Sequence, residues 1–136
     1  MYLLDTVVIS ELFKAQRHPS VRRWMEGASA SHLYLSSVTV AEIELGIGKE
    51  HRRNNTTFAN ALTQWLEVTL NSFGDKVLPL DVRAARKWGS LTARMGHTGW
   101  DLAIAAIALE HDLTVVTRNV SDFEPTGVPV LNPFVE

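Results

Sequence analysis

The stretch Met1-Tyr2-Leu3-Leu4-Asp5-Thr6 decides the fold of this chain. A short apolar run ends at an acid, and the apolar residues that follow, from Val8 to Phe13, recur at helical spacing. An unbroken apolar run is typical of a strand that is buried on both faces, as in a parallel sheet. The stretch therefore predicts a central strand that leads directly into a helix. Ligands of open α/β sheets bind beyond the carboxyl ends of such strands, which makes Asp5 the first candidate functional residue.

Strand and helix patterns alternate along the rest of the chain. The third predicted strand contains Pro79, which favours an edge position because proline has no N–H for a strand ladder. The alternation predicts an α/β fold, a three-layer α/β/α sandwich with a central, mainly parallel five-stranded sheet. The predicted strands are residues 1–4, 32–36, 76–80, 113–117 and 128–131, and the predicted helices are residues 7–14, 20–26, 38–48, 53–72, 82–95 and 101–110.

Length and composition bound the class of protein. The chain has 136 residues, of which 46% are hydrophobic, and we expect residues 1–136 to form one domain with a buried core. It has no cysteine, which excludes disulfides and thiolate metal sites. No signal peptide is recognisable, and no apolar run approaches the roughly 20 residues that span a bilayer, so we expect a cytoplasmic protein. The net charge of −2 argues against a broadly basic nucleic-acid binder.

Parallel strands bring strand ends and helix starts to one edge of the sheet. Three of four acids reach that edge by this topology, and Asp101 does so if its helix starts there. Asp5 follows the first strand, and Glu42 lies in the first turn of the helix after the second strand. Asp101 opens the helix before the fourth strand, and Asp122 follows that strand. Converging carboxylates repel one another, and a divalent cation relieves the repulsion. Oxygen ligands select Mg²⁺ or Mn²⁺ rather than Zn²⁺, and such a site best supports phosphodiester hydrolysis by metal-activated water.

Each acid also has a purely structural interpretation. Thr39-x-x-Glu42 and Thr98-x-x-Asp101 both fit a capping box. Asp5 fits a helix N-cap, and Asp122 fits an ordinary turn. The joint placement of the four acids, rather than any one of them, favours the functional interpretation.

Four stretches of the chain carry a family resemblance: Leu4–Thr6 (LDT), Leu35–Ile43 (LSSVTVAEI), Trp100–Ala106 (WDLAIAA) and Val116–Phe123 (VTRNVSDF). In order and spacing they resemble the PIN domains of VapC-type and FitB-type bacterial toxins. The resemblance implies a Mg²⁺- or Mn²⁺-dependent endoribonuclease toxin that a small antitoxin neutralises, with a structured RNA such as tRNA as substrate. It also implies a homodimer and a toxin–antitoxin hetero-oligomer.

The resemblance implies roles for seven residues, position by position. Many relatives have Asn two residues after the first Asp, where this chain has Val7. We expect this difference to affect the first loop rather than metal binding. The residues implied to bind metal and act in catalysis are Asp5, Glu42, Asp101 and Asp122, and those implied to support them or contact RNA are Thr6, Thr117 and Asn119.

Two other classes of protein stay open. A receiver-type phosphoryl-transfer domain also groups acids around Mg²⁺, and Asp81 would suit it. That class fits poorly because Val7 stands where it has a second acid, and no lysine follows the last strand. The other alternative is a PIN-like module that only binds partners.

Two surface features accompany these expectations. Trp100 adjoins Asp101, and we expect it either to stack on an RNA base or to close the site. The helices predicted at residues 7–14, 20–26 and 38–48 carry more apolar residues than one small sheet needs. They predict an exposed groove that fits an amphipathic antitoxin helix.

Overall fold

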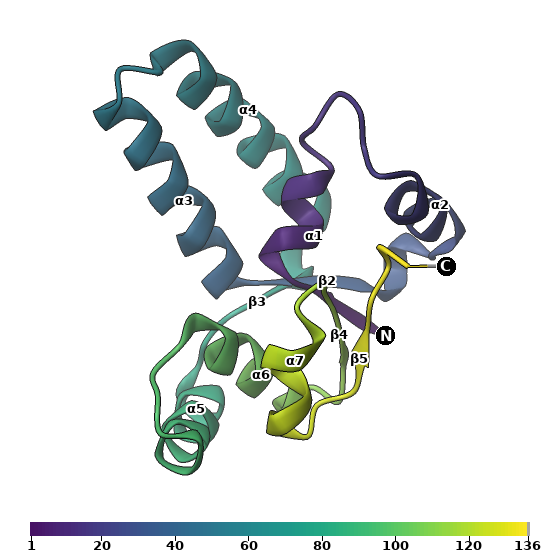
Figure 1. Cartoon of the computed structure of the whole chain (residues 1–136), viewed down its shortest axis with the longest axis vertical. Helices are drawn as coiled ribbons and strands as arrows, with labels where there is room; N and C mark the ends of the chain where they lie inside the picture. Colours follow the sequence, from purple (N-terminus) through teal and green to yellow (C-terminus); the bar gives the residue numbers. More distant parts are fainter. Residues whose placement is uncertain (136) are drawn as a thin grey trace.

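The computed structural model describes residues 1–135, and in those residues it contains one five-stranded sheet whose pairings are all parallel (Figure 1). The strands are β1 (Tyr2–Leu4), β2 (Leu33–Ser36), β3 (Val77–Leu78), β4 (Thr114–Val116) and β5 (Val130–Leu131). Their order is β3-β2-β1-β4-β5. The central position predicted for the first strand is therefore confirmed, as is the edge position of the third. β3 ends at Leu78, immediately before Pro79.

Helices cover both faces of this sheet (Figure 1). They are α1 (Thr6–Glu11), α2 (Pro19–Gly27), α3 (Ser37–Arg52), α4 (Thr56–Phe73), α5 (Val82–Met95), α6 (Trp100–Glu110) and α7 (Val120–Phe123), with 3₁₀ turns at Ala30–His32, Gly74–Lys76 and Glu124–Thr126. Because successive strand residues point to opposite faces, Leu3 packs in one core and Leu4 in the other. The Leu3 core lies against α5, α6 and α7, and the Leu4 core lies against α1 to α4. The predicted three-layer architecture is confirmed.

Helix α3 extends beyond its predicted end. Gly46 and Gly48 predicted that it stops near residue 48, and this prediction is wrong. A glycine inside a helix costs only about 1 kcal/mol relative to alanine. Lys49 and Arg52 in the last turn compensate in part, because cations there interact favourably with the helix dipole. The chain then turns at Asn54, whose φ of 62° is a left-handed conformation that Asn tolerates, and α4 begins later than predicted.

The short helix α7 was not predicted. Its four residues are too few to show a helical period, and the sequence indicated a turn there. Phe123 is fully buried and anchors the helix in the core beside α6. Asp122 therefore lies in the first turn of a helix. Within residues 1–135, no helix has the length and apolar character needed to cross a bilayer.

Asp81 has a structural function at the start of α5. Its Oδ1 accepts a hydrogen bond from the backbone N–H of Ala84 at 2.9 Å, which makes it the N-cap of this helix. The acid that would have suited a receiver-type domain is therefore engaged in capping.

We expect Asp81→Ala to lower the free energy of unfolding by about 1 kcal/mol, because the Ala84 N–H loses its acceptor. Asp81→Asn keeps an acceptor oxygen and should lose less. Urea denaturation of the two variants beside the wild type measures both changes. An equal loss in the two variants, or none in Asp81→Ala, would contradict the capping function.

Candidate active site

Asp5 is fixed at the carboxyl end of the central strand and is only 3% exposed. Its Oδ1 accepts a hydrogen bond from the backbone N–H of Thr6 at 2.8 Å, and its Oδ2 accepts one from the hydroxyl of Thr117 at 2.7 Å. Its own N–H donates to the carbonyl of Val116 at 2.9 Å. These contacts hold the carboxyl group between the ends of β1 and β4, while Asp5 also serves as the N-cap of α1.

Glu42 lies one turn further into α3 than predicted. The helix begins at Ser37, and its N-cap Ser36 accepts a hydrogen bond from the N–H of Thr39 at 3.0 Å. The alternative interpretation of Thr39 and Glu42 as a capping box therefore does not hold. Glu42 Oε1 instead accepts a hydrogen bond from the hydroxyl of Thr6 at 2.7 Å, and that hydroxyl also lies 2.9 Å from the hydroxyl of Thr39. Thr6 thus connects the start of α1 to the acid on α3.

Asp101 and Asp122 lie in the first turns of α6 and α7. The N-cap of α6 is Gly99, which has no side chain, so the alternative interpretation of Thr98 and Asp101 as a capping box does not hold. Asp101 interacts electrostatically with Asp5, which places the start of α6 at the same edge of the sheet. Asp122 is exposed, and its negative charge repels that of Asp101.

Burial makes the Asp5 carboxyl group a weaker acid than an exposed aspartate. The pKa of Asp5 is raised from 3.8 to about 6, chiefly because burial removes solvent from the carboxylate, and repulsion from Asp101 and Glu42 contributes to this increase. The hydrogen bonds from Thr117 and Thr6 oppose this change because they favour the ionised form.

The two neighbouring acids are shifted in the same direction. Burial raises the pKa of Glu42, repulsion from Asp101 adds to this, and the Thr6 hydrogen bond opposes it. Burial also raises the pKa of Asp101, repulsion from Asp122 adds to this, and His97 opposes it. Like charges at this edge therefore favour protonation, which a nearby cation would reverse.

The predicted acids come together as a loose group. Asp5, Glu42 and Asp101 all interact with one another, and Asp122 joins through Asp101. Across residues 1–135, no three His, Cys, Asp or Glu side chains lie close enough to form a ready metal site. The donor set nevertheless fits Mg²⁺ or Mn²⁺, because it consists of carboxylates whose mutual repulsion a hard cation relieves.

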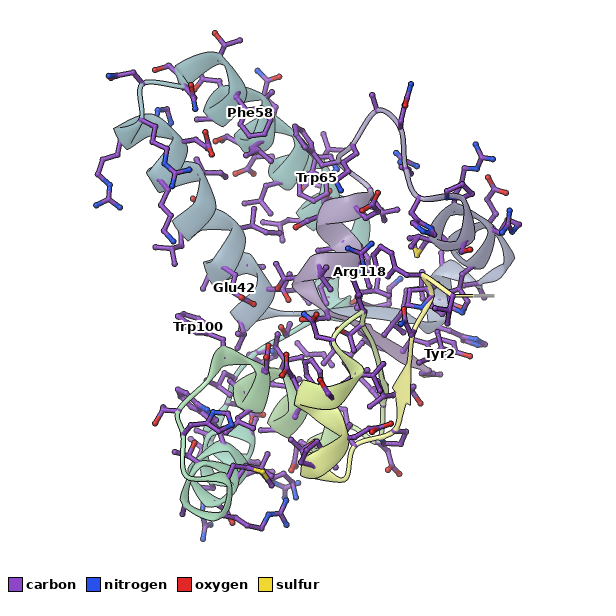
Figure 2. The ribbon with its side chains drawn as sticks, in the orientation of Figure 1. Tyr2, Glu42, Phe58, Trp65, Trp100 and Arg118 are labelled. Atoms are coloured by element: carbon purple, nitrogen blue, oxygen red, sulfur yellow. The ribbon has the colours of Figure 1, made fainter. Side chains whose placement is uncertain are left out.

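Several polar and aromatic residues surround the acids. Thr117 and Thr6 contact carboxyl groups, whereas Asn119 donates its backbone N–H to Thr117 Oγ1 at 2.9 Å and has an exposed side chain. Trp100 is 49% exposed, and Figure 2 shows it on the same side of the view as Glu42. Sequence reasoning missed the hydroxyls of Ser36 and Thr39, although a serine between a strand and a helix is a common N-cap.

A largely apolar cavity of about 670 Å³ lies between α1, α3 and α4. The sequence predicted such a groove with α2 as a wall, but α4 takes that place because it packs along α3 (Figure 1). Phe13, Phe58 and Trp65 contribute aromatic rings to its lining. Thr6 and Glu42 line it as well, so the cavity reaches the acidic edge of the sheet.

The raised pKa of Asp5 has a consequence for stability. Below pH 4 both folded and unfolded chains are protonated at Asp5, and between about pH 4 and pH 6 only the unfolded chain ionises. Stability should therefore fall as pH rises through this window. In metal-free buffer we expect Asp5→Asn, relative to the wild type, to gain on the order of 2–3 kcal/mol between pH 4 and pH 7.5.

Chemical denaturation at several pH values measures this gain. Asp75→Asn, which changes an exposed carboxylate, serves as the matched control and should show little pH-dependent difference. A difference between Asp5→Asn and the wild type that stays constant with pH would contradict the assigned burial.

Comparison with known proteins agrees with the fold and with the quoted motifs. Residues 2–125 match the family model described as the PIN domain. The chain is 38% identical to VapC ribonuclease Y4jK of Sinorhizobium fredii over 98% of each chain. It is 35% identical to toxin FitB of Neisseria gonorrhoeae over 98% of this chain and 99% of that one. The crystal structure of FitAcB from Neisseria gonorrhoeae superposes with a TM-score of 0.87 and 35% identity over the full length of both chains. The chain therefore belongs to the PIN-domain family, and its relatives include a VapC ribonuclease and the toxin FitB.

Proposed function

We propose that this chain is a Mg²⁺- or Mn²⁺-dependent endoribonuclease that acts as the toxin of a toxin–antitoxin pair in the cytoplasm. The names of its relatives, VapC ribonuclease and toxin FitB, support the class of activity. The observation that carries the proposal is the acidic edge of the sheet. There, the buried carboxyl of Asp5 has its pKa raised to about 6 and interacts with Glu42 and Asp101.

Asp5, Glu42 and Asp101 would hold the cation, and Asp122 would complete the site from its exposed side. When bound, the cation would lower the pKa of a coordinated water and would supply a positive charge that stabilises the phosphate during in-line attack. The carboxyl groups must be ionised to bind the cation. Their raised pKa values oppose ionisation, and the positive charge of the cation would offset the repulsion between them.

The supporting hydroxyls orient these acids. Thr117 donates to Asp5 Oδ2 and Thr6 donates to Glu42 Oε1, so each carboxyl group keeps one direction relative to the sheet edge. Hydrogen bonds of this kind fix the orientation of metal-binding carboxylates. The side chain of Val7 has no hydrogen-bonding group, so the hydrogen bonds that hold Asp5 and Glu42 come from other residues.

We propose a structured RNA such as tRNA as the substrate, cleaved in an unpaired region. Proteins that recognise RNA sequence usually contact loops, whose unstacked bases are accessible. Trp100, half-exposed beside Asp101, provides an aromatic surface for such a base. Its exposure favours stacking over closure of the site, and such stacking contributes about 1–3 kcal/mol per base.

We propose the cavity between α1, α3 and α4 as the binding site of an antitoxin helix. Phe58 is 49% exposed at this cavity, and an apolar helix face would cover it. Because Glu42 lines the same cavity, a cation carried by the antitoxin would reach the acids and block them. The family resemblance extends the proposal to a homodimer within a toxin–antitoxin hetero-oligomer.

A PIN-like scaffold without activity is the second candidate. The observation that favours it is the loose spacing of the acids, since no three of the described acidic or histidine side chains form a ready metal group. Metal-dependent cleavage separates the two candidates.

We expect the purified, antitoxin-free protein to cut total cellular RNA into discrete fragments with Mg²⁺ or Mn²⁺ and not with EDTA. Asp5→Asn and Asp101→Asn should abolish cleavage, because each removes a negative ligand without changing the shape of the side chain. Asp81→Asn, a carboxylate outside the site, is the matched control and should retain activity. Undiminished activity in Asp5→Asn would sink the assignment. No cleavage by the folded wild type with either metal would favour the scaffold.

The supporting hydroxyls should matter less than the acids. We expect Thr117→Val to reduce the rate of cleavage about 10- to 100-fold at saturating RNA, because Asp5 loses an orienting hydrogen bond. Thr117→Ser keeps the hydroxyl and should restore most of the rate. Steady-state kinetics on one labelled fragment gives both values, and equal losses in the two variants would argue that Thr117 acts through packing instead.

A further inference from the structure

Among the lysines and arginines, Arg118 is the closest in sequence to one of the four acids, since it lies four residues before Asp122. It follows Thr117, whose hydroxyl holds Asp5, and its own side chain lies over the ring of Phe134, with Cζ 3.7 Å from the ring centroid. Figure 2 shows Arg118 at the centre of the view beside α1, with Glu42 and Trp100 to its left. The backbone of Arg118 therefore adjoins the residue that holds Asp5, and its guanidinium group lies beside Phe134, where its charge acts on Glu11 at the end of α1.

The ring that supports Arg118 is itself fixed. Phe134 is 8% exposed and packs in the core beneath α1 to α4. Its other contacts are an edge-on ring contact with His18 at 5.3 Å and a hydrogen bond from its N–H to Asn132 Oδ1 at 2.9 Å. A guanidinium group on an aromatic face keeps its N–H donors free at the edge and loses less freedom when it binds an anion.

Arg118 has no anionic partner among residues 1–135 within ion-pair distance. Its charge acts on Glu11, but the carboxylate of Glu11 is already held by Lys14 at 3.0 Å and by the N–H of His18 at 3.0 Å. The exposed guanidinium of Arg118 is therefore available to an external anion.

Other cations of the chain are placed differently. Arg83 and Lys87, both on α5, lie 3.5 Å and 3.8 Å from the carboxylate of Glu110. Glu110 is the last residue of α6, at the opposite end of that helix from Asp101. Arg53 lies 3.7 Å from Glu50 at the distal end of α3. These three cations are thus partly neutralised by carboxylates, whereas Arg118 has no such carboxylate among the described residues.

We propose that Arg118, supported by Phe134, binds an RNA backbone phosphate next to the scissile bond and positions the strand across the acidic edge. The inference rests on the proposed ribonuclease function. Carboxylates repel the RNA backbone, so a phosphate neighbouring the cleaved one needs a cation at the margin of the site. Arginine suits this task because its planar group binds phosphate through two parallel hydrogen bonds.

Binding is measured first, with cleavage prevented by Asp101→Asn. The probe is a fluorescein-labelled hairpin RNA with an unpaired loop, titrated in Mg²⁺ between 50 and 200 mM salt, roughly the range over which phosphate contacts weaken. Adding Arg118→Gln should weaken binding about tenfold and reduce the salt slope by about 0.7. Arg118→Lys should restore the slope but only part of the affinity. Phe134→Leu should weaken binding with the slope unchanged, because the charge remains.

Cleavage is measured second, in the otherwise wild-type chain. Arg118→Gln should raise KM with a smaller change in kcat, because the Arg118 side chain positions the RNA and does not bind the metal ion. Arg83→Gln is the matched control. Arg83 is paired with Glu110 at the end of α6, so its replacement should change neither KM nor the salt slope. Melting temperatures of all variants establish that they are folded.

Unchanged affinity and slope in Arg118→Gln would overturn the inference and leave the ribonuclease proposal intact. Equal losses in Arg118→Gln and Arg118→Lys without a change in slope would assign Arg118 to packing, and this also overturns it. If Arg118→Gln weakened the binding of polyglutamate as much as the binding of the hairpin RNA, Arg118 would be assigned to an acidic protein partner instead of RNA. Arg118-dependent RNA binding without any cleavage by the wild type would overturn the ribonuclease function alone. No RNA binding by the Asp101→Asn chain would overturn the inference.

Discussion

The structure depends on one buried carboxyl group at the end of its central strand. Asp5 receives hydrogen bonds from the Thr6 N–H and the Thr117 hydroxyl, which join the first strand, the first helix and the fourth strand at one point. Burial alone would favour the neutral acid, and the hydrogen bonds favour the anion. The result is a group that changes its charge state near neutral pH and therefore responds to a cation.

The fold supplies the other acids to this point. An all-parallel sheet places its strand ends and the following helix starts at one edge, which brings Glu42 on α3 towards Asp5. Helix α6 follows α5 rather than a strand, and Asp101 in its first turn also interacts with Asp5. The same edge meets an apolar cavity on one side, and Arg118 follows Thr117, which holds Asp5. One edge thus combines groups suited to a cation, a partner helix and an RNA backbone, so each can influence the others through charge.

The sequence predicted the order of elements and the joint placement of the acids, because apolar periodicity and strand–helix alternation are local signals. It failed where distant contacts decide. The glycines of α3 did not end the helix, since tertiary packing outweighs a small local preference. The hydroxyl chain through Thr6, and the stacking of Arg118 on Phe134, join residues far apart in sequence and leave no periodic trace. The spacing between the carboxyl groups was likewise beyond local patterns.

The most direct test of the central claim is proton release on metal binding. Titration calorimetry of Mn²⁺ into the wild type, in two buffers of different ionisation enthalpy, measures the number of protons released at pH 6 and at pH 8. The account predicts about half a proton from Asp5 alone at pH 6, with further release from Glu42 and Asp101, and almost none at pH 8. Binding without proton release at pH 6, or no binding at either pH, would contradict it.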